Sequence, residues 1–262
     1  MKVFGAVAAL VSLAVFSGCA TEPVGKVRRA PPLPALQMPA VQLAVRAPAP
    51  ASVHALTVPG DLPAMVVEGA ETATTDARAP KIVFLPGMCS NAAGYLWTFP
   101  EAARAAGGVL AIDGDEPCPG VKNFHTFSWD AEKQHRRIEA ALARAGTAND
   151  APITLIGYSQ GAVFAEKLAA KYPERFHKIV LIGAPLDPVA SHFAASEAFV
   201  TMSCALDVRA RMKKAAQGVA ARGVPATYVE MPGCAHGAVG DGEAKFAEVF
   251  AFLRQAPSTA RF

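Results

Sequence analysis

Short, continuous apolar runs alternate with longer amphipathic segments along most of this chain, and that alternation limits the fold it can adopt. The clearest runs are Lys81–Leu85, Ile153–Tyr158 and Ile179–Ile182. Strands that are apolar throughout are typical of a parallel sheet covered on both faces. The segment from Trp129 to Ala145 carries apolar residues at helical spacing and ends at Gly146. The sequence therefore predicts an α/β fold, a mostly parallel sheet flanked by helices on both faces.

The rest of the chain shows the same alternation of expected strands and helices. Further strands are expected at 53–58, 65–68, 109–112, 199–203 and 226–230, and helices at 91–106, 161–171, 208–221 and 243–253. In open parallel sheets, ligands and chemistry lie beyond the carboxyl ends of the strands. Candidate site residues are therefore those that directly follow a strand.

One such strand end carries the sequence Gly157-Tyr158-Ser159-Gln160-Gly161. This is G-x-S-x-G between a strand and a helix, the setting in which that motif presents a nucleophilic serine. The sharp turn leaves no room for side chains at the two glycines. The N-terminus of the following helix favours negative charge that develops beside the serine. Ser159 is the predicted nucleophile.

The first residues resemble an export signal. Lys2 precedes an apolar run from Val3 to Phe16, which is short for a membrane span and suits a signal peptide. The run closes with Phe16-Ser17-Gly18-Cys19, which resembles a bacterial lipobox, with Phe16 where leucine is usual. Cys19 is the predicted lipidation site, and the plainer alternative is an ordinary signal peptide. The expected location is the cell envelope, at the outer membrane if the cell is Gram-negative.

A proline-rich segment follows. Seven of the chain's 21 prolines lie between Thr21 and Pro50, a density typical of an extended spacer. The expected organisation is a signal peptide at 1–18, a Pro/Ala-rich tether at 19–50 and one folded domain at 51–262. The formal net charge of +3 is too small and too scattered to predict nucleic-acid binding.

The pentapeptide and its setting resemble the α/β-hydrolase superfamily, over about residues 81–253. The Gly-Tyr-Ser-Gln-Gly sequence looks like that of cutinases and small carboxylesterases. The resemblance implies the chain order nucleophile, acid, histidine, which Ser159, Asp207 and His236 match. His236 follows the last expected strand, and Asp207 follows the strand before it. Asp187, one strand earlier still, is the alternative acid.

The resemblance also implies an oxyanion hole made by two backbone amides. One is that of Gln160, the residue after the nucleophile, and the other is that of Met88 in the loop Pro86-Gly87-Met88-Cys89. Many relatives have His-Gly where this chain has Pro86-Gly87, so the support of this loop is expected to differ.

Four cysteines remain after Cys19, and an exported domain can keep disulfides. The superfamily places the strands before Cys89 and Cys118 side by side. Cys204 and Cys234 likewise follow the last two strands, on the loops of the predicted acid and histidine. This implies the bridges Cys89–Cys118 and Cys204–Cys234, with buried free thiols as the alternative.

Other features favour no additional chemistry. Asp113, Asp115 and Glu116 are expected to form a solvated loop rather than a cation site. No spacing predicts a zinc site or a nucleotide cofactor, so no metal and no cofactor are expected. Tyr95, Trp97 and Phe99 are expected to line an acyl pocket or to pack in the core. His125 is a candidate for substrate contact.

Together these features predict a serine esterase that acts on a small-molecule or lipid ester and meets the membrane only through its anchor. A thioesterase or peptidase of the same fold remains open. So does a binding lipoprotein that has lost turnover.

Overall fold

An eight-stranded sheet forms the centre of the fold, and six neighbouring strands in it are parallel. The computed structural model describes residues 50–70 and 79–256. The sheet order is β1-β2-β4-β3-β7-β8-β9-β10, and only the pairings of β1 with β2 and of β2 with β4 are antiparallel. The strands are β1 (His54–Leu56), β2 (Ala64–Glu68), β3 (Ile82–Leu85), β4 (Gly108–Ala111), β7 (Ile153–Tyr158), β8 (Phe176–Ile182), β9 (Ala198–Cys204) and β10 (Ala226–Met231).

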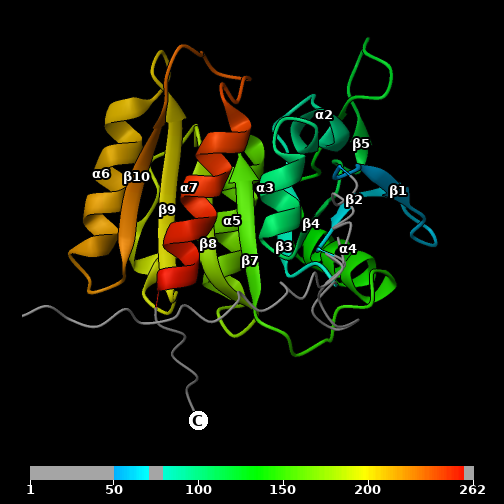
Figure 1. Cartoon of the computed structure of the whole chain (residues 1–262), viewed down its shortest axis with the longest axis horizontal. Helices are drawn as coiled ribbons and strands as arrows, with labels where there is room; N and C mark the ends of the chain where they lie inside the picture. Colours follow the sequence, from blue (N-terminus) through cyan, green and yellow to red (C-terminus); the bar gives the residue numbers. More distant parts are fainter. Residues whose placement is uncertain (1–49, 71–78, 257–262) are drawn as a thin grey trace, which may run out of the picture. The chain divides into compact units, whose positions relative to one another are not determined.

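Helices cover both faces of this sheet. Figure 1 is viewed from the side of α3 and α7, and the parallel strands point toward its top edge. One buried cluster joins the sheet to α4, α5 and α6, and the other joins it to α2, α3 and α7. The helices are α2 (Ala92–Leu96), α3 (Pro100–Ala105), α4 (Ala131–Arg144), α5 (Gln160–Lys171), α6 (Arg209–Ala220) and α7 (Gly242–Gln255). The predicted α/β architecture is confirmed.

Strand β3 shows why these strands are apolar throughout. Val83 and Leu85 enter one cluster, while Ile82 and Phe84 enter the other. Because successive side chains of a strand point to opposite faces, a strand covered on both sides buries every residue. An alternation of apolar and polar residues would have predicted a strand with one face exposed to solvent instead.

The expected helix at 91–106 is wrong as a single element. The structure has α2 and α3, separated by Trp97, Thr98 and Phe99. Phe99 leaves the helical region, with φ −150° and ψ 43°, and Pro100 occupies the first position of α3. Proline has no N–H to donate and suits the first turn of a helix, so it begins a new helix here.

A small hairpin was not expected from the sequence. Strands β5 (Glu116–Pro117) and β6 (His125–Thr126) pair antiparallel, with Glu116 opposite Thr126. Both strands are two residues long and lack an apolar pattern, so periodicity gives no signal for them. This hairpin lies at the carboxyl edge of the sheet and supports part of the site.

Candidate active site

The turn from β7 into α5 holds Ser159 in a backbone conformation that few non-glycine residues adopt, with φ 51° and ψ −112°. A Cβ on Gly157 would stand 2.3 Å from the Gly161 carbonyl oxygen. One on Gly161 would stand 2.1 Å from that of Leu85. Both distances are well inside van der Waals contact, so the turn requires both glycines. Strain of this kind concentrates at functional sites.

The imidazole of His236 bridges Ser159 and Asp207. His236 Nε2 lies 2.9 Å from Ser159 Oγ, and His236 Nδ1 lies 2.9 Å from Asp207 Oδ2. In the tautomer with a proton on Nδ1, the imidazole donates to the carboxylate and accepts the serine proton at Nε2. Such an arrangement activates a serine hydroxyl as a nucleophile.

The acid and the base of this trio differ in exposure. The side chain of Asp207 is 7% exposed, whereas that of His236 is 45% exposed. A buried carboxylate and an exposed imidazole would suit the predicted roles, in which the first orients the ring and the second exchanges protons. Gly183, with φ 54°, lies against this pair, and a Cβ there would stand 2.8 Å from Asp207 Oδ2.

Asp187, the alternative acid, lies elsewhere. Its side chain is 68% exposed and accepts a hydrogen bond of 2.9 Å from Arg211 Nε. Lys214 Nζ is a further 3.9 Å partner. The carboxylate that meets His236 is that of Asp207.

The loop expected to supply an oxyanion donor approaches the serine closely. A Cβ on Gly87 would stand 3.3 Å from Ser159 Cβ. Met88 follows, 57% exposed, and Cys89 has a positive φ of 50°. Gln160 begins α5, where the first N–H groups of a helix have no acceptor within the helix. Both predicted donors therefore flank Ser159.

The β5–β6 hairpin supports this loop. The backbones of Ser90 and His125 exchange two hydrogen bonds, 3.2 and 3.0 Å long. Ser90 Oγ donates to the Gly87 carbonyl at 2.5 Å, and Asn91 Nδ2 donates to the Asn123 carbonyl at 3.1 Å. These contacts fix the turn that carries Met88.

The cysteines lie in the expected pairs. Cys89 and Cys118 are joined with a Cα–Cα separation of 5.2 Å, and Cys204 and Cys234 with one of 5.0 Å. The first bridge links the loop of Met88 to the hairpin. The second links the loop after β9, which carries Asp207, to the loop after β10, which carries His236.

The side chain of Gln160 has a role that sequence reasoning missed. It is 3% exposed, and its Oε1 accepts from Thr126 Oγ1 at 2.9 Å and from Phe127 N at 3.0 Å. Its Nε2 donates to the Phe127 carbonyl at 3.1 Å. The residue after the predicted nucleophile thus holds the hairpin through its side chain. In the sequence, this contact is signalled only by the presence of a polar glutamine within the G-x-S-x-G motif.

The expectation of a solvated loop at Asp113–Glu116 is wrong for the two aspartates. Asp113 is 9% exposed and accepts from Ala92 N at 2.6 Å, and burial raises its pKa. The Asp115 side chain is 5% exposed. The two aspartate side chains are covered because residues of β6 and α4 and the segment between them pack against them. No group of three acidic, histidine or cysteine side chains able to hold a metal ion occurs within residues 50–70 and 79–256.

Asp115 is held as an anion by several donors. Burial alone would raise its pKa, but hydrogen bonds from Lys133, Ser128 and Gln134 outweigh burial and keep the pKa well below its usual value. Ser128 donates from both N and Oγ, at 2.8 and 2.6 Å, and Lys133 Nζ lies 2.5 Å away. Asp115 therefore ties the end of β6 to the start of α4.

The aromatic residues near α2 divide between core and surface. Phe99 is fully buried and stacks on Phe246 at 3.7 Å, and Tyr95 packs 5.0 Å from Tyr158. Trp97 is 66% exposed. Tyr95 and Phe99 are therefore core residues. His125 lies in β6, with its Nδ1 buried and without a hydrogen-bond partner.

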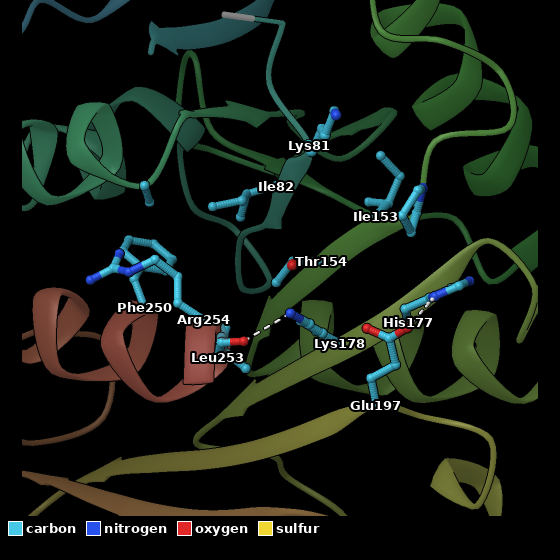
Figure 2. Close-up of a pocket in the computed structure, with 12 residues that line it drawn as sticks. Lys81, Ile82, Ile153, Thr154, His177, Lys178, Glu197, Phe250, Leu253 and Arg254 are labelled. Carbon is cyan, nitrogen blue, oxygen red and sulfur yellow. Dashed lines mark hydrogen bonds and ion pairs between the residues drawn. The ribbon is translucent and has the colours of Figure 1, made fainter. Parts of the chain in front are cut away.

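A cavity of about 220 Å³ lies at the amino ends of the parallel strands, opposite the ends that carry Ser159 and His236. Figure 2 shows Lys81, Thr154 and Lys178 around it, with Lys178 Nζ donating to the Leu253 carbonyl at 2.8 Å. Ser159 and His236 are not among its lining residues. This cavity is separate from the site at the carboxyl ends.

The predicted signal peptide, the lipidation site Cys19 and most of the proline-rich tether lie outside the described residues. Among the helices that the structure does describe, none is both long and apolar enough to cross a membrane.

Comparisons with known proteins agree with the fold. The family described as alpha/beta hydrolase fold matches residues 117–229. A predicted CIB-like hydrolase from Thermoplasma acidophilum is similar in structure, with a TM-score of 0.56 and 15% identity over 78% of this chain and 98% of its own. A putative lipase from Acinetobacter baumannii has a TM-score of 0.55 and 14% identity, covering 79% of this chain and 92% of its own.

A third similar structure is an esterase from Pyrobaculum calidifontis, with a TM-score of 0.55 and 17% identity over 78% of this chain and 83% of its own. The chain has no match among curated protein sequences. At these identities the likeness shows the α/β-hydrolase fold.

Proposed function

We propose that this protein is a serine hydrolase that cleaves carboxylic esters through an acyl-enzyme. The observation that carries the proposal is the imidazole of His236, whose two nitrogens each lie 2.9 Å from an oxygen, one of Ser159 and one of Asp207. A serine hydroxyl hydrogen-bonded to a histidine, which is in turn hydrogen-bonded to a buried carboxylate, is the arrangement found in known acyl-transfer sites.

In the first half-reaction, His236 Nε2 takes the hydroxyl proton as Ser159 Oγ attacks the ester carbonyl carbon. Asp207 stabilises the imidazolium that forms. The carbonyl oxygen becomes an oxyanion and receives hydrogen bonds from the amides of Met88 and Gln160. The tetrahedral intermediate then collapses, and the imidazolium gives its proton to the leaving alkoxide.

In the second half-reaction, the imidazole of His236 takes a proton from water, and the hydroxide attacks the acyl carbon. The tetrahedral intermediate again places its oxyanion between the two amides. Collapse returns the proton to Ser159 Oγ and releases the carboxylic acid. Every proton step uses His236, whose exposed ring can also exchange protons with solvent.

An apolar acyl or alcohol group fits the surroundings of this site. Met88, Leu186 and Leu206 are 57%, 62% and 77% exposed, on the loops that follow β3, β8 and β9. Large exposed apolar side chains on site loops indicate contact with an apolar ligand. Two similar structures are named an esterase and a putative lipase, which also favours an ester.

A fluorophosphonate probe tests the proposal directly. The purified protein should be labelled at Ser159, and Ser159→Ala should abolish labelling and p-nitrophenyl ester hydrolysis while its circular dichroism spectrum stays unchanged. Loss of one member of such a trio typically removes several orders of magnitude of kcat. Absence of labelling in the wild type would instead support a binding protein with this fold.

A panel of matched substrates separates the enzymatic alternatives. Esters, thioesters and amides with one common acyl group should be hydrolysed in that order of preference, with esters first. Preference for the thioester or amide would assign a thioesterase or peptidase. Varying the acyl chain length in the same panel defines the natural substrate class.

Export and lipidation at Cys19 belong to the same proposal. The lipobox-like sequence supports them, and so do two disulfides, which persist in oxidising compartments. The wild type should incorporate a labelled fatty acid, and Cys19→Ser should not. Equal incorporation in both forms would mean that the anchor is not at this cysteine.

A further inference from the structure

Tyr158 connects the nucleophile turn to the loop that carries the histidine. It is the last residue of β7, directly before Ser159, and its side chain is 1% exposed. The backbone N–H of Gly237 donates to its phenolic oxygen at 2.6 Å. The phenolic O–H points to the Ala238 carbonyl at the longer distance of 3.4 Å.

The adjacent residues Tyr158 and Ser159 therefore contact two adjacent residues of the loop after β10. Ser159 Oγ contacts His236 Nε2, and the oxygen of Tyr158 receives the amide proton of Gly237. The contact next to the reacting pair fixes where the backbone of the histidine stands relative to the serine. A histidine that is 45% exposed has little packing of its own to do this.

The tyrosine ring is itself held firmly. It packs 5.0 Å from the ring of Tyr95 and 5.5 Å from that of His236. On the other side of His236 in the same loop, Cys234 is bound to Cys204. The disulfide anchors the start of the loop, whereas the tyrosine anchors the residue after the histidine.

We propose that Tyr158 is a positioning residue that sets the separation of His236 from Ser159 through its hydrogen bond to Gly237. The inference rests on the proposed serine-hydrolase function and extends it to a second residue of the G-x-S-x-G motif. Tyr158 does not touch the reacting atoms. It acts through the imidazole, and its contribution disappears when the imidazole is absent.

Tyr158→Phe removes the hydroxyl and keeps the ring. We expect kcat to fall about 10- to 100-fold, with KM of a p-nitrophenyl ester within about twofold, because a small misplacement of a proton acceptor costs rate rather than binding. Tyr228→Phe is the matched control. Its hydroxyl lies 3.0 Å from Ser203 Oγ, away from the histidine loop, and its removal should leave kcat unchanged.

A double-mutant cycle on the slow residual hydrolysis locates the effect. In a His236→Ala background, Tyr158→Phe should cause no further loss of rate, because the group through which it acts is gone. An equal fold-loss in both backgrounds would overturn the inference, and so would a kcat of Tyr158→Phe equal to the wild type.

The imidazole proton shared with Asp207 gives a readout that needs no turnover. In the wild type, proton NMR should show a far-downfield resonance of His236 Nδ1–H, and Tyr158→Phe should broaden or shift it. An unchanged resonance would overturn the inference even if the protein labels at Ser159. Absence of labelling with a perturbed resonance would instead refute the proposed function and leave the positioning contact established.

Discussion

At the scale of single residues, the choice between two aspartates decides the chemistry of the site. Asp207 and Asp187 both follow a strand and both lie near a helix of basic residues. Asp207 is enclosed, with its carboxylate facing His236, whereas Asp187 faces solvent and pairs with Arg211. An exposed ion pair is worth little energetically and orients nothing. Only the enclosed carboxylate can hold the imidazole in one tautomer.

Replacing each aspartate by asparagine tests this assignment. Asp207→Asn should lower kcat by about 10³- to 10⁴-fold, because an amide no longer stabilises the imidazolium or selects its tautomer. Asp187→Asn is the matched control and should leave kcat within about twofold of the wild type. Initial rates with a p-nitrophenyl ester measure both. Equal losses in the two variants would contradict the assignment.

At the scale of elements, Asp115 joins the β5–β6 hairpin to α4. Lys133 and Gln134 of α4 and Ser128 after β6 all donate to its carboxylate. Arg137 extends the network, donating to the Asp113 carbonyl at 2.9 Å and to the carboxylate of Asp61. The hairpin in turn supports the Met88 loop, so a buried charge network lies behind one wall of the site.

The lowered pKa of Asp115 predicts a loss of stability in acid. Its folded pKa is below the unfolded value, so its contribution is complete above about pH 4 and is lost as pH falls toward the folded pKa. At pH 7, Asp115→Asn should lower the free energy of unfolding by about 2 kcal/mol, since an amide accepts the hydrogen bonds of Ser128 and Gln134 less strongly than a carboxylate and no longer pairs with Lys133.

Urea unfolding of wild type and variant at pH 7 and pH 3 measures this. The difference between the two proteins should shrink at the lower pH. Asp150→Asn, at an exposed turn position, is the control and should change stability little at either pH. A difference for Asp115→Asn that is the same at both pH values would refute the argument.

The two disulfides close loops of nearly equal length, with sequence separations of 29 and 30 residues. Loop entropy therefore predicts that the double variants Cys89→Ser/Cys118→Ser and Cys204→Ser/Cys234→Ser each lose about 3–4 kcal/mol of stability. Each bridge also holds one part of the site. We expect kcat to fall in both at a temperature where both remain folded.

Thermal melts and initial rates of the two double variants serve as controls for each other. Equal losses of stability with unchanged kcat in both would mean that the bridges stabilise the fold alone. A large loss of kcat in only one variant would identify the half of the site that depends on its bridge.

The elements that sequence reasoning found and missed differ in physical kind. Strand β3 is buried throughout, and β7 and β8 are buried apart from one or two residues near their starts, so their apolar runs are visible in the sequence. The hairpin β5–β6 is held instead by Cys118, by the side chain of Gln160 and by backbone bonds to Ser90. Such contacts join distant residues and leave no periodic pattern. The same holds for Tyr158, whose partner Gly237 is known only once the loop is folded.

At the scale of the whole described domain, the strand direction gathers the site on one edge. Ser159, Asp207 and His236 follow β7, β9 and β10, whose carboxyl ends meet there. The segment between β8 and β9 is short. Here it contains one 3₁₀ turn, η1 (Ala190–Phe193).

That segment is fastened to the helices below it. Arg211 Nη1 of α6 donates to the carbonyls of Ala184 and Pro185 at 3.0 and 2.9 Å, and Glu166 of α5 accepts from Val189 N at 2.9 Å. Hydrogen bonds at the start and in the middle of a short segment oppose the large movement that a lid requires. We therefore expect this segment to stay in place beside an open site.

An open site beside a segment that stays in place predicts hydrolysis without interfacial activation. The rate on a lipid ester should rise smoothly through its critical micelle concentration, changing by less than about twofold there, because no closed state has to be opened. Arg211→Gln sharpens the test. If the segment were a lid held shut by Arg211, this variant would hydrolyse monomeric substrate faster than the wild type. We expect it to be no faster below the critical micelle concentration and to show the same smooth profile above it. A sharp jump for the wild type, or a faster variant with monomers, would show that the segment opens.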